Sequence, residues 1–269
     1  MDSEAITALL NSLICLAPFC MGVLGLAAFG ALLVWVIRRQ WQPKGETTLA
    51  AERETMRSRL DQMAADLQPW SPEGLTDLST DWDARWTKFG RTLSAQGTIP
   101  SLSESKGPGW VAFALKVRGA RQPEGQMQAR TTSQAFDYRI SREGVNILVN
   151  GAPLGSVQPD GTLLDANGQP IGSASRPGGL PAMFRVGSVA KLHDERERTY
   201  PLILGERTVA YLANPPAQMT NVISLKKRQF APAVTLESTP SDDEEATWLL
   251  ALAILQVAFH NLLETVWTN

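Results

Sequence analysis

The segment that most constrains the fold of this chain is 241–267, with the sequence SDDEEATWLLALAILQVAFHNLLETVW. Between Ala246 and Phe259, its only polar side chains are Thr247 and Gln256. A helix that is apolar on every side has to be buried on every side. This apolar run is shorter than the roughly 20 residues that a membrane-spanning helix needs, because polar residues soon interrupt it. The rest of the chain is therefore expected to wrap around this helix.

The start of the same segment carries the signals of a helix N-terminus. Ser241 can cap the helix, and Glu244 completes a capping box. Acidic residues fill positions 242–245, where the helix dipole favours negative charge. We expect the apolar side chains that follow to form the core of the domain. The residues predicted for this core helix are Trp248, Leu249, Leu252, Leu255 and Phe259.

The region before this helix predicts a series of short strands separated by turns. Asn150–Ser156 (NGAPLGS) recurs as Asn167–Ser173 (NGQPIGS). Each copy begins with Asn-Gly, the strongest hairpin signal, because both central residues of a type I′ turn need positive φ. Strands are predicted at 110–117, 135–140, 145–149, within 150–174, twice in 178–192, and at 200–204, 207–212, 221–227 and 233–237. Around a dozen strands can close a barrel that is wide enough to enclose a helix.

Two of these segments resemble the tubby C-terminal-like superfamily, which includes tubby domains, phospholipid scramblases and plant LURP-one-related proteins. They are LLDANGQPIGSA at 163–174 and the apolar helix that begins EEATWLLALAILQ at 244–256. The resemblance implies a mainly β fold, a closed antiparallel β-barrel of about 12 strands around a buried hydrophobic C-terminal α-helix. We place this tubby-like domain at 109–269. Because tubby domains bind phosphoinositides, the resemblance also implies recognition of anionic lipid headgroups.

Residues 13–37 predict a transmembrane helix that follows a short N-terminal segment, 1–12. This stretch carries no charge and would form a helix about 37 Å long, enough to cross a bilayer. Basic residues follow it at Arg38, Arg39 and Lys44, and the positive-inside rule places such a flank on the cytoplasmic side. A cleaved signal peptide is disfavoured because acidic residues, and no basic ones, precede the apolar stretch. We therefore expect a single-pass membrane protein, held in the bilayer by 13–37, with a cytoplasmic C-terminal domain.

Two segments connect this helix to the C-terminal domain. Residues 45–67 predict an amphipathic helix whose apolar side chains recur at alternating steps of three and four residues. Its apolar stripe is expected to pack on the domain or on a subunit of a membrane complex, and self-association as a short coiled coil is the alternative. Residues 68–108 are predicted to be a linker that contains a short helix.

The short helix in this linker is predicted to place Trp82, Trp86 and Phe89 on one face. We expect these aromatic side chains to dock on the domain. Contact with lipid headgroups is the alternative, because basic residues lie beside the aromatic ones. These basic residues are Arg85, Lys88 and Arg91.

The composition of the chain argues against several classes of function. The formal net charge of −2 gives no basic field for nucleic acid, so no nucleic-acid partner is expected. The cysteines, Cys15 and Cys20, lie in the first apolar stretch, and the only histidines are His193 and His260. We predict no metal site, no cofactor and no catalytic residues, because neither zinc-ligand spacing nor a GxSxG, GxGxxG or P-loop motif is present. The chain is therefore not expected to be an enzyme.

Lys226, Lys227 and Arg228 form the densest basic cluster of the predicted barrel. Each basic residue near an anionic bilayer surface contributes about 1 kcal/mol of binding, so this cluster is our candidate lipid-headgroup site. A solvated strand end is the alternative interpretation. We expect a non-enzymatic binding or scaffold module, anchored in a membrane and facing the cytoplasm. An accessory subunit of a larger membrane complex and scramblase-like lipid transport are the alternatives.

A flotation experiment tests this candidate lipid site. A fragment of about residues 70–269 is expected to float with anionic liposomes, and to float less at high salt because exposed charges are screened over about 8–10 Å. Replacing Lys226, Lys227 and Arg228 together by serine is expected to remove most of the flotation without lowering stability. Equal flotation of the wild type and the triple variant would exclude the cluster as the site.

Overall fold

The computed structural model of the chain contains two compact units, 1–52 and 53–269, which we treat separately. In the first unit, residues 29–32 and 34–35 are helical. Helix α2 (Glu46–Ala64) begins in the first unit and ends in the second. The residues that the structure describes are 29–32, 34–35, 46–90, 92–104, 107–119, 124–174, 199–213 and 231–268.

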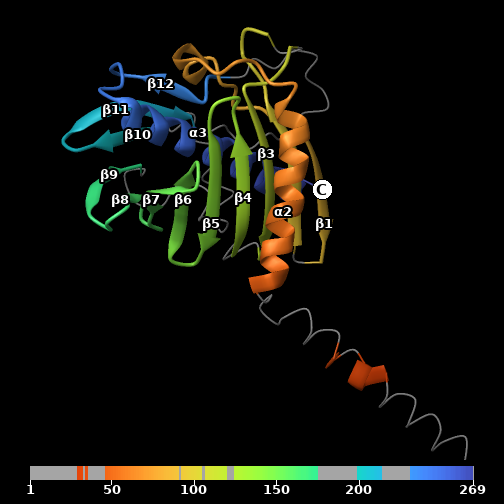
Figure 1. The fold of residues 1–269 in the computed structure, drawn as a ribbon. Helices are drawn as coiled ribbons and strands as arrows, with labels where there is room; N and C mark the ends of the chain where they lie inside the picture. The colour runs from red at the N-terminus through yellow and green to blue at the C-terminus, as the bar shows by residue number, and fades with distance from the viewer. Residues whose placement is uncertain are drawn as a thin grey trace, which may run out of the picture. The chain divides into compact units, whose positions relative to one another are not determined.

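The second unit is built on one 12-stranded antiparallel sheet, in which each strand pairs with its neighbours in the sequence (Figure 1). A short 3₁₀ helix, η1 (Pro72–Leu75), precedes the sheet. This strand order suits a chain with many turn motifs, because antiparallel neighbours can be joined by hairpins. The strands are β1 (Asp83–Phe89), β2 (Thr92–Ile99), β3 (Val111–Arg118), β4 (Glu124–Arg130), β5 (Ala135–Ser141), β6 (Gly144–Val149), β7 (Ala152–Val157), β8 (Thr162–Asp165), β9 (Pro170–Ser173), β10 (Thr199–Leu204), β11 (Arg207–Ala213) and β12 (Val234–Leu236).

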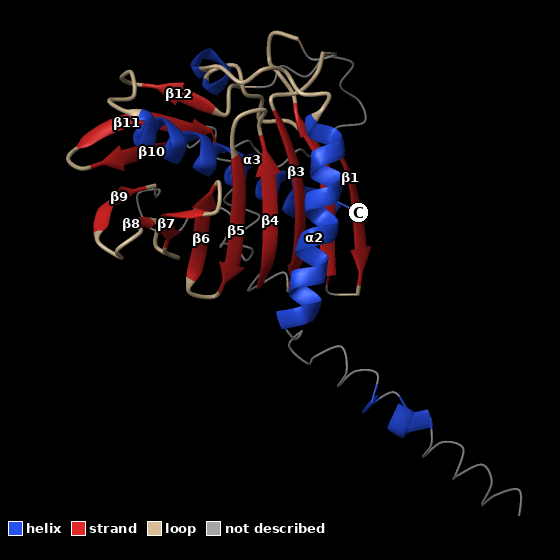
Figure 2. Ribbon diagram, in the orientation of Figure 1, coloured by secondary structure: helices blue, strands red, loops and turns tan. Residues whose placement is uncertain are grey.

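Helix α3 (Asp243–Thr268) packs against β2, β3 and β11 and lies at the centre of the core (Figure 2). Every side chain from Trp248 to Phe259 is buried, which includes the five residues that the sequence places in the core helix. The inner faces of the strands supply large apolar partners such as Phe113, Tyr138 and Ile147. The sheet therefore curves around a helix that no single flat layer could cover.

Two tyrosines on the sheet hydrogen-bond to the buried helix. The hydroxyl of Tyr138 donates to the backbone oxygen of Ala251 at 2.9 Å. The hydroxyl of Tyr200 donates to Oε1 of Gln256 at 3.0 Å. Both bonds are buried, where a polar group without a partner is costly. They therefore favour one position of α3 along its own axis.

A glycine of the repeated motif allows the sheet to approach α3 closely. At Gly155, an added Cβ atom would lie 2.8 Å from Cζ2 of Trp248 and 2.0 Å from the backbone oxygen of Leu164. No real Cβ atom tolerates the second distance, so any other residue would force β7 and β8 apart. The turn before β7 has positive φ at both Asn150 (52°) and Gly151 (83°), as the predicted type I′ turn requires.

The second copy of the motif forms a different turn. Here Oδ1 of Asp165 accepts hydrogen bonds from the backbone N–H groups of Asn167 and Gln169, both at 2.8 Å. Only Gly168 has a positive φ, of 79°. The aspartate side chain therefore organises this turn, and the type I′ prediction is wrong for the second Asn-Gly pair.

The prediction of a closed barrel is also wrong, because β1 and β12 do not pair and the sheet is open. Near this gap, single bridging pairs join Leu78 to Ser101 and Ser79 to Pro232. Strand β1 has seven residues and β12 has three. Unequal length does not by itself prevent pairing, since all three residues of β12 pair with the seven-residue β11.

The structure likewise contradicts the predicted transmembrane helix. Among the described residues, no helix is both long enough and apolar enough to span a membrane. Helix α2 is rich in charged residues, and the apolar run of α3 is buried within the sheet. A single-pass membrane protein with a cytoplasmic domain is therefore not supported. Most of 13–37, and the flanking residues Arg38, Arg39 and Lys44, lie outside the described residues.

The aromatic residues expected on a short helix lie instead on and before strand β1. Successive side chains of a strand point to opposite faces, so Trp82 and Trp86 share the inner face and Phe89 lies on the other. Trp82 stacks on Phe113 with ring centroids 5.5 Å apart, and Trp86 packs against the core. Strands β1 and β2 both lie in 68–108, the range predicted as a linker, and they belong to the sheet.

The apolar stripe of the 45–67 segment packs on the outer face of the sheet. Met56, Leu60 and Leu67 are buried against Ala112 and Ala114 of β3. These two alanines are small enough to let α2 lie close to the strand. Polar contacts flank the stripe: Asp61 forms an ion pair with Arg130, and Nη1 of Arg59 donates to Oε1 of Gln96 at 3.2 Å.

Truncating the buried helix side chains is expected to destabilise the second unit severely. Replacing Leu252 and Leu255 together by alanine costs about 2–5 kcal/mol for each site, because apolar contacts are lost and cavities remain. The unfolding free energy of a domain is only about 5–15 kcal/mol. Denaturant unfolding measures the change, with Phe89→Ala as the control because that side chain is 81% exposed. A loss similar to that of the control would contradict the buried position of α3.

Candidate interaction surface

Strand β1 forms the longer of the two open edges of the sheet. It pairs with β2 along its whole length, from Asp83 opposite Thr98 to Phe89 opposite Thr92. Gly90, with a φ of 58°, follows β1 in the connection to β2. Among the described residues, no strand pairs with the other edge of β1. Immediately before β1, Ser79 forms a single antiparallel bridge with Pro232, and the N–H of Thr80 donates to the backbone oxygen of Ala231 at 3.2 Å.

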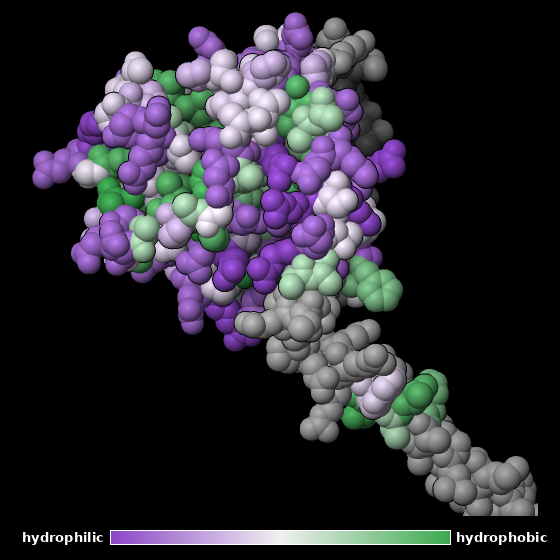
Figure 3. Space-filling model, viewed as in Figure 1, coloured by the Kyte–Doolittle hydropathy of each residue, from purple (hydrophilic) through white to green (hydrophobic). Residues whose placement is uncertain are grey.

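The two faces of β1 differ in burial. On the inner face, Ala84 and Trp86 are half-buried and pack against the core. On the outer face, Arg85, Thr87 and Phe89 are exposed. Within the described part of 53–269, Phe89 is the only exposed large apolar side chain. The exposed phenylalanine distinguishes this part of the surface from the largely hydrophilic face around α2 (Figure 3).

The basic residues of β1 also lack partners among the residues that the structure describes. Elsewhere in the second unit, Arg142 Nε lies 2.8 Å from Oε1 of Glu124, and Arg207 is paired with Glu245. Among the described residues, Arg85 and Lys88 have neither an ion pair nor a side-chain hydrogen bond, and both are exposed. Charged side chains on an edge strand discourage indiscriminate strand pairing.

We name the β1 edge as the surface formed by Asp83–Phe89, with the exposed cations Arg85 and Lys88 and the exposed Phe89. Part of this surface was visible in the sequence, since Arg85, Lys88 and the aromatic residues were noted together. The sequence interpretation assumed a helix, however, and therefore missed the strand. Alternation of Trp82, Ala84 and Trp86 with polar residues is the signal that favours a strand.

Asp77 is the centre of a polar cluster that fastens the chain before β1. Its Oδ2 accepts hydrogen bonds from the hydroxyl of Ser101 and from Nε1 of Trp110, the latter at 2.9 Å. Its Oδ1 accepts the backbone N–H of Ser103 at 3.0 Å. Burial acts to raise the pKa of Asp77, but the hydrogen bonds from Ser101, Trp110 and Ser103 together lower it. These hydrogen bonds hold the segment before β1 against the loop between β2 and β3.

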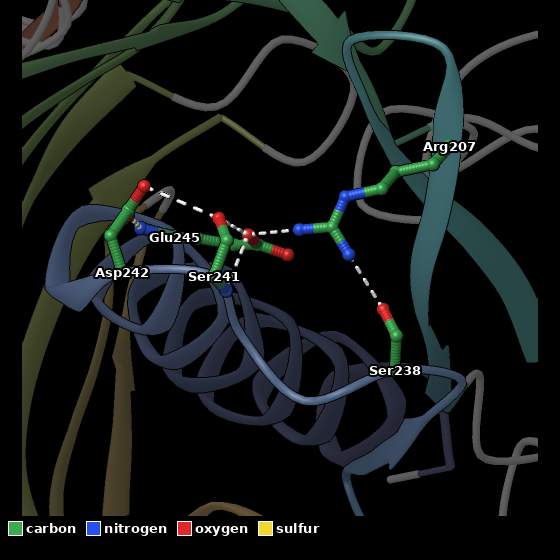
Figure 4. Close-up of polar contacts among 5 residues, drawn as sticks. All are labelled: Arg207, Ser238, Ser241, Asp242 and Glu245. Atoms are coloured by element: carbon green, nitrogen blue, oxygen red, sulfur yellow. Dashed lines mark hydrogen bonds and ion pairs between the residues drawn. The ribbon is translucent and has the colours of Figure 1, made fainter.

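A second polar cluster fixes the start of α3 (Figure 4). Oε2 of Glu245 accepts the backbone N–H of Ser241 at 2.9 Å and faces Nη2 of Arg207 at 2.5 Å. Nη1 of Arg207 donates to the hydroxyl of Ser238 at 2.7 Å. Oδ1 of Asp242 accepts the backbone N–H of Glu245 at 2.8 Å and caps the helix. The capping residues are therefore Asp242 and Glu245, one position later than the sequence indicates, because Glu245 is buried beside Arg207.

The remaining titratable groups also have structural roles. Backbone hydrogen bonds from Thr162 lower the pKa of Asp160, and those from Gln169 lower the pKa of Asp165. Burial, followed by the charge of Asp137, raises the pKa of Tyr138 well above its usual value. No group of three or more histidine, cysteine, aspartate or glutamate residues that could hold a metal ion exists in the described part of the chain.

The candidate lipid-headgroup residues Lys226, Lys227 and Arg228 lie outside the described residues, as does His193. His260 lies on α3, within the part of the helix whose side chains are not described. The lipid-site hypothesis therefore rests on the sequence.

Comparisons of the chain with protein-family models, with curated proteins and with solved structures gave no significant match. The resemblance to the tubby C-terminal-like superfamily therefore stays a prediction from the quoted sequence segments.

Acid is expected to weaken the contribution of Asp77 to stability. Because its folded-state pKa is lowered, its hydrogen bonds stabilise the fold above the unfolded pKa of about 3.9, and this contribution is lost as the pH falls through the folded pKa. Asp77→Asn is expected to cost about 1–2 kcal/mol at pH 7, and less below about pH 4. Urea unfolding at several pH values measures this, with the exposed Glu143→Gln as control. A constant difference between wild type and Asp77→Asn across this range would contradict the assignment.

Proposed function

We propose that this chain is a non-enzymatic binding and scaffold module that holds a partner polypeptide at the β1 edge. The observation that carries the proposal is Phe89, 81% exposed on the outer face of β1, with the exposed cations Arg85 and Lys88 on the same strand. Aromatic and arginine side chains are enriched at protein interfaces. A partner chain that bound there would cover Phe89.

The filling of the domain core supports binding on the outside of the protein. Small-molecule substrates usually enter a concave, pre-formed cavity. In the second unit, the space within the curved sheet is occupied by the side chains of α3, from Trp248 to Phe259. The polar clusters at Asp77 and Glu245 join loops and the helix start. The β1 edge differs from both because its polar and charged side chains, such as Arg85, Thr87 and Lys88, are exposed.

Site-specific photo-cross-linking in the native cell tests this proposal. A benzophenone amino acid replaces Thr87, which is exposed on the outer face of β1. In a second variant it replaces Glu143, which is exposed in the turn between β5 and β6. We expect a discrete adduct of higher mass from position 87 and none from position 143. Equal cross-linking from both positions, or none from position 87, would reject the β1 edge as the contact surface.

Recognition of anionic lipid headgroups is the second candidate function. The observation that favours it is Phe89, 81% exposed at the end of β1, beside the unpaired Lys88. Aromatic and basic side chains together suit the interface of an anionic bilayer. Phe89→Ser in the liposome flotation assay is the corresponding variant. Unchanged flotation of this variant would remove β1 from the lipid-binding surface.

A further inference from the structure

We propose that Asn167 is a modification site that deamidates spontaneously in the folded chain and thereby loosens the β8–β9 turn, whereas Asn150 is protected. The two asparagines occupy equivalent positions in the repeated motif, each is followed by glycine, and both are exposed. Asparagine before glycine is the pair most prone to this reaction, because glycine has no side chain to obstruct the attack of its own backbone nitrogen. The β8–β9 turn is not part of the β1 edge.

The reaction needs only water and the atoms of the turn. The backbone nitrogen of Gly168 attacks the side-chain amide carbon, Cγ, of Asn167, and the bond between Cγ and Nδ2 breaks. The Gly168 nitrogen gives up its proton, and ammonia leaves with Nδ2. Water then opens the succinimide ring at either carbonyl carbon, which gives aspartate or isoaspartate at position 167. One neutral amide is thereby replaced by one carboxylate, without an oxidant, a cofactor or an enzyme.

The backbone and the contacts of Asn150 oppose this reaction. Its φ of 52° lies in the left-handed region, where the following nitrogen points away from the side chain, whereas ring closure brings the two together. Oδ1 of Asn150 accepts the backbone N–H of Ala135 at 2.9 Å, and the N–H of Asn150 donates to the backbone oxygen of Ala135 at 2.8 Å. Both bonds tie Asn150 to β5, so its side chain reaches the nitrogen of Gly151 only after this turn separates from β5.

The contacts of Asn167, in contrast, stay within its own turn. Asn150 is the only described non-glycine residue with a positive φ, so Asn167 does not share that obstacle. The N–H of Asn167 donates to Oδ1 of Asp165 at 2.8 Å, and its Nδ2 donates to Oδ2 of Asp165 at 3.4 Å. The N–H of Gly168 donates to the backbone oxygen of Asp165 at 3.1 Å. Because Asp165 accepts all three bonds, the opening of one turn frees both the side chain and the attacking nitrogen.

The hairpin that carries Asn167 is also short. Strands β8 and β9 have four residues each, whereas β6 and β7, on either side of the Asn150 turn, have six each. Strand β9 pairs with β10 at Gly172 and Ser173. Local opening costs less free energy where fewer strand pairs have to separate. The turn at Asn167 is therefore expected to open more often than the turn at Asn150.

Deamidation changes the balance of donors and charges in this turn. Nδ2 of Asn167 is a donor to Asp165, whereas an ionised carboxylate only accepts hydrogen bonds. Backbone hydrogen bonds, of which that from Gln169 has the largest effect, lower the pKa of Asp165, so its carboxylate is charged at neutral pH and repels a second one. Isoaspartate also lengthens the backbone of the turn by one atom. The tip of the β8–β9 hairpin is therefore expected to become less ordered as the protein ages.

Mass spectrometry of the full chain tests this assignment. The folded protein is incubated at mildly alkaline pH, which favours loss of the Gly168 proton, and the peptides that contain Asn150 and Asn167 are quantified over time. We expect Asn167 to deamidate at least about tenfold faster than Asn150, because Asn150 must first give up two hydrogen bonds to β5. The same chain in concentrated urea is the matched control. Both sites are unfolded Asn-Gly pairs there, and their rates are expected to be similar.

Three outcomes would overturn the proposal. They are equal rates at the two sites of the folded chain, a faster reaction at Asn150, and no reaction at Asn167 under conditions in which the unfolded chain reacts. Asn167→Gln is expected to abolish the fast release of ammonia, because glutamine would have to close a larger ring. Ammonia release at the wild-type rate from this variant would assign the reaction to another residue and reject the site.

Asn167→Asp tests the effect of the product on the turn. The amides of β8 and β9 are expected to exchange with solvent faster than in the wild type, and those of β5 are expected to be unchanged. Equal exchange of β8 and β9 in the two proteins would reject the loosening of the turn. Faster exchange throughout the sheet would also reject it, because the effect would then not be local.

Discussion

The burial of helix α3 is the constraint on which the rest of the second unit depends. All side chains from Trp248 to Phe259 are buried, and fully burying one large apolar side chain contributes about 1.5–3 kcal/mol. A flat sheet covers only one side of a helix. The 12-stranded sheet therefore has to curve around α3, and its inner positions have to be apolar. The close approach at Gly155 follows from the same requirement, because the Trp248 ring occupies the space that a side chain there would need.

Polar contacts give this apolar packing a defined register. A helix covered by leucine, alanine and valine side chains can slide or rotate against the sheet at little cost in free energy, whereas specific hydrogen bonds fix its position. Tyr138 and Tyr200 bond to the middle of α3, and Arg207 pairs with Glu245 at its start. Glu245 is only 6% exposed, so removal of Arg207 would leave a buried carboxylate without its cation. Each of these three contacts joins α3 to a different strand, so together they link the buried helix to the sheet around it.

Within the described residues, the sheet ends in β1 on one side and in β12 on the other. Strand length does not explain this, because the three-residue β12 pairs with the seven-residue β11. Single bridging pairs tie the segment before β1 to the chain elsewhere, Leu78 to Ser101 and Ser79 to Pro232. A module with a filled interior, whose first strand carries exposed cations and an exposed phenylalanine, is suited to contacts on its exterior. The function proposed for the β1 edge depends on this contrast between a filled core and an exposed strand.

The sequence alone predicted the buried C-terminal helix, many short antiparallel strands and the type I′ turn at Asn150. These features depend on local patterns: an apolar run without a polar face, turn residues, and alternation over a few positions. The sequence did not predict that the described sheet stays open, that Trp82 and Trp86 belong to a strand region, or that Glu245 pairs with Arg207 at the start of α3. These features depend on contacts between residues far apart in the chain, such as Arg207 with Glu245 and Trp82 with Phe113. The spacing of aromatic residues at 82, 86 and 89 fits both a helix and a strand, and only the pairing of β1 with β2 decides between them.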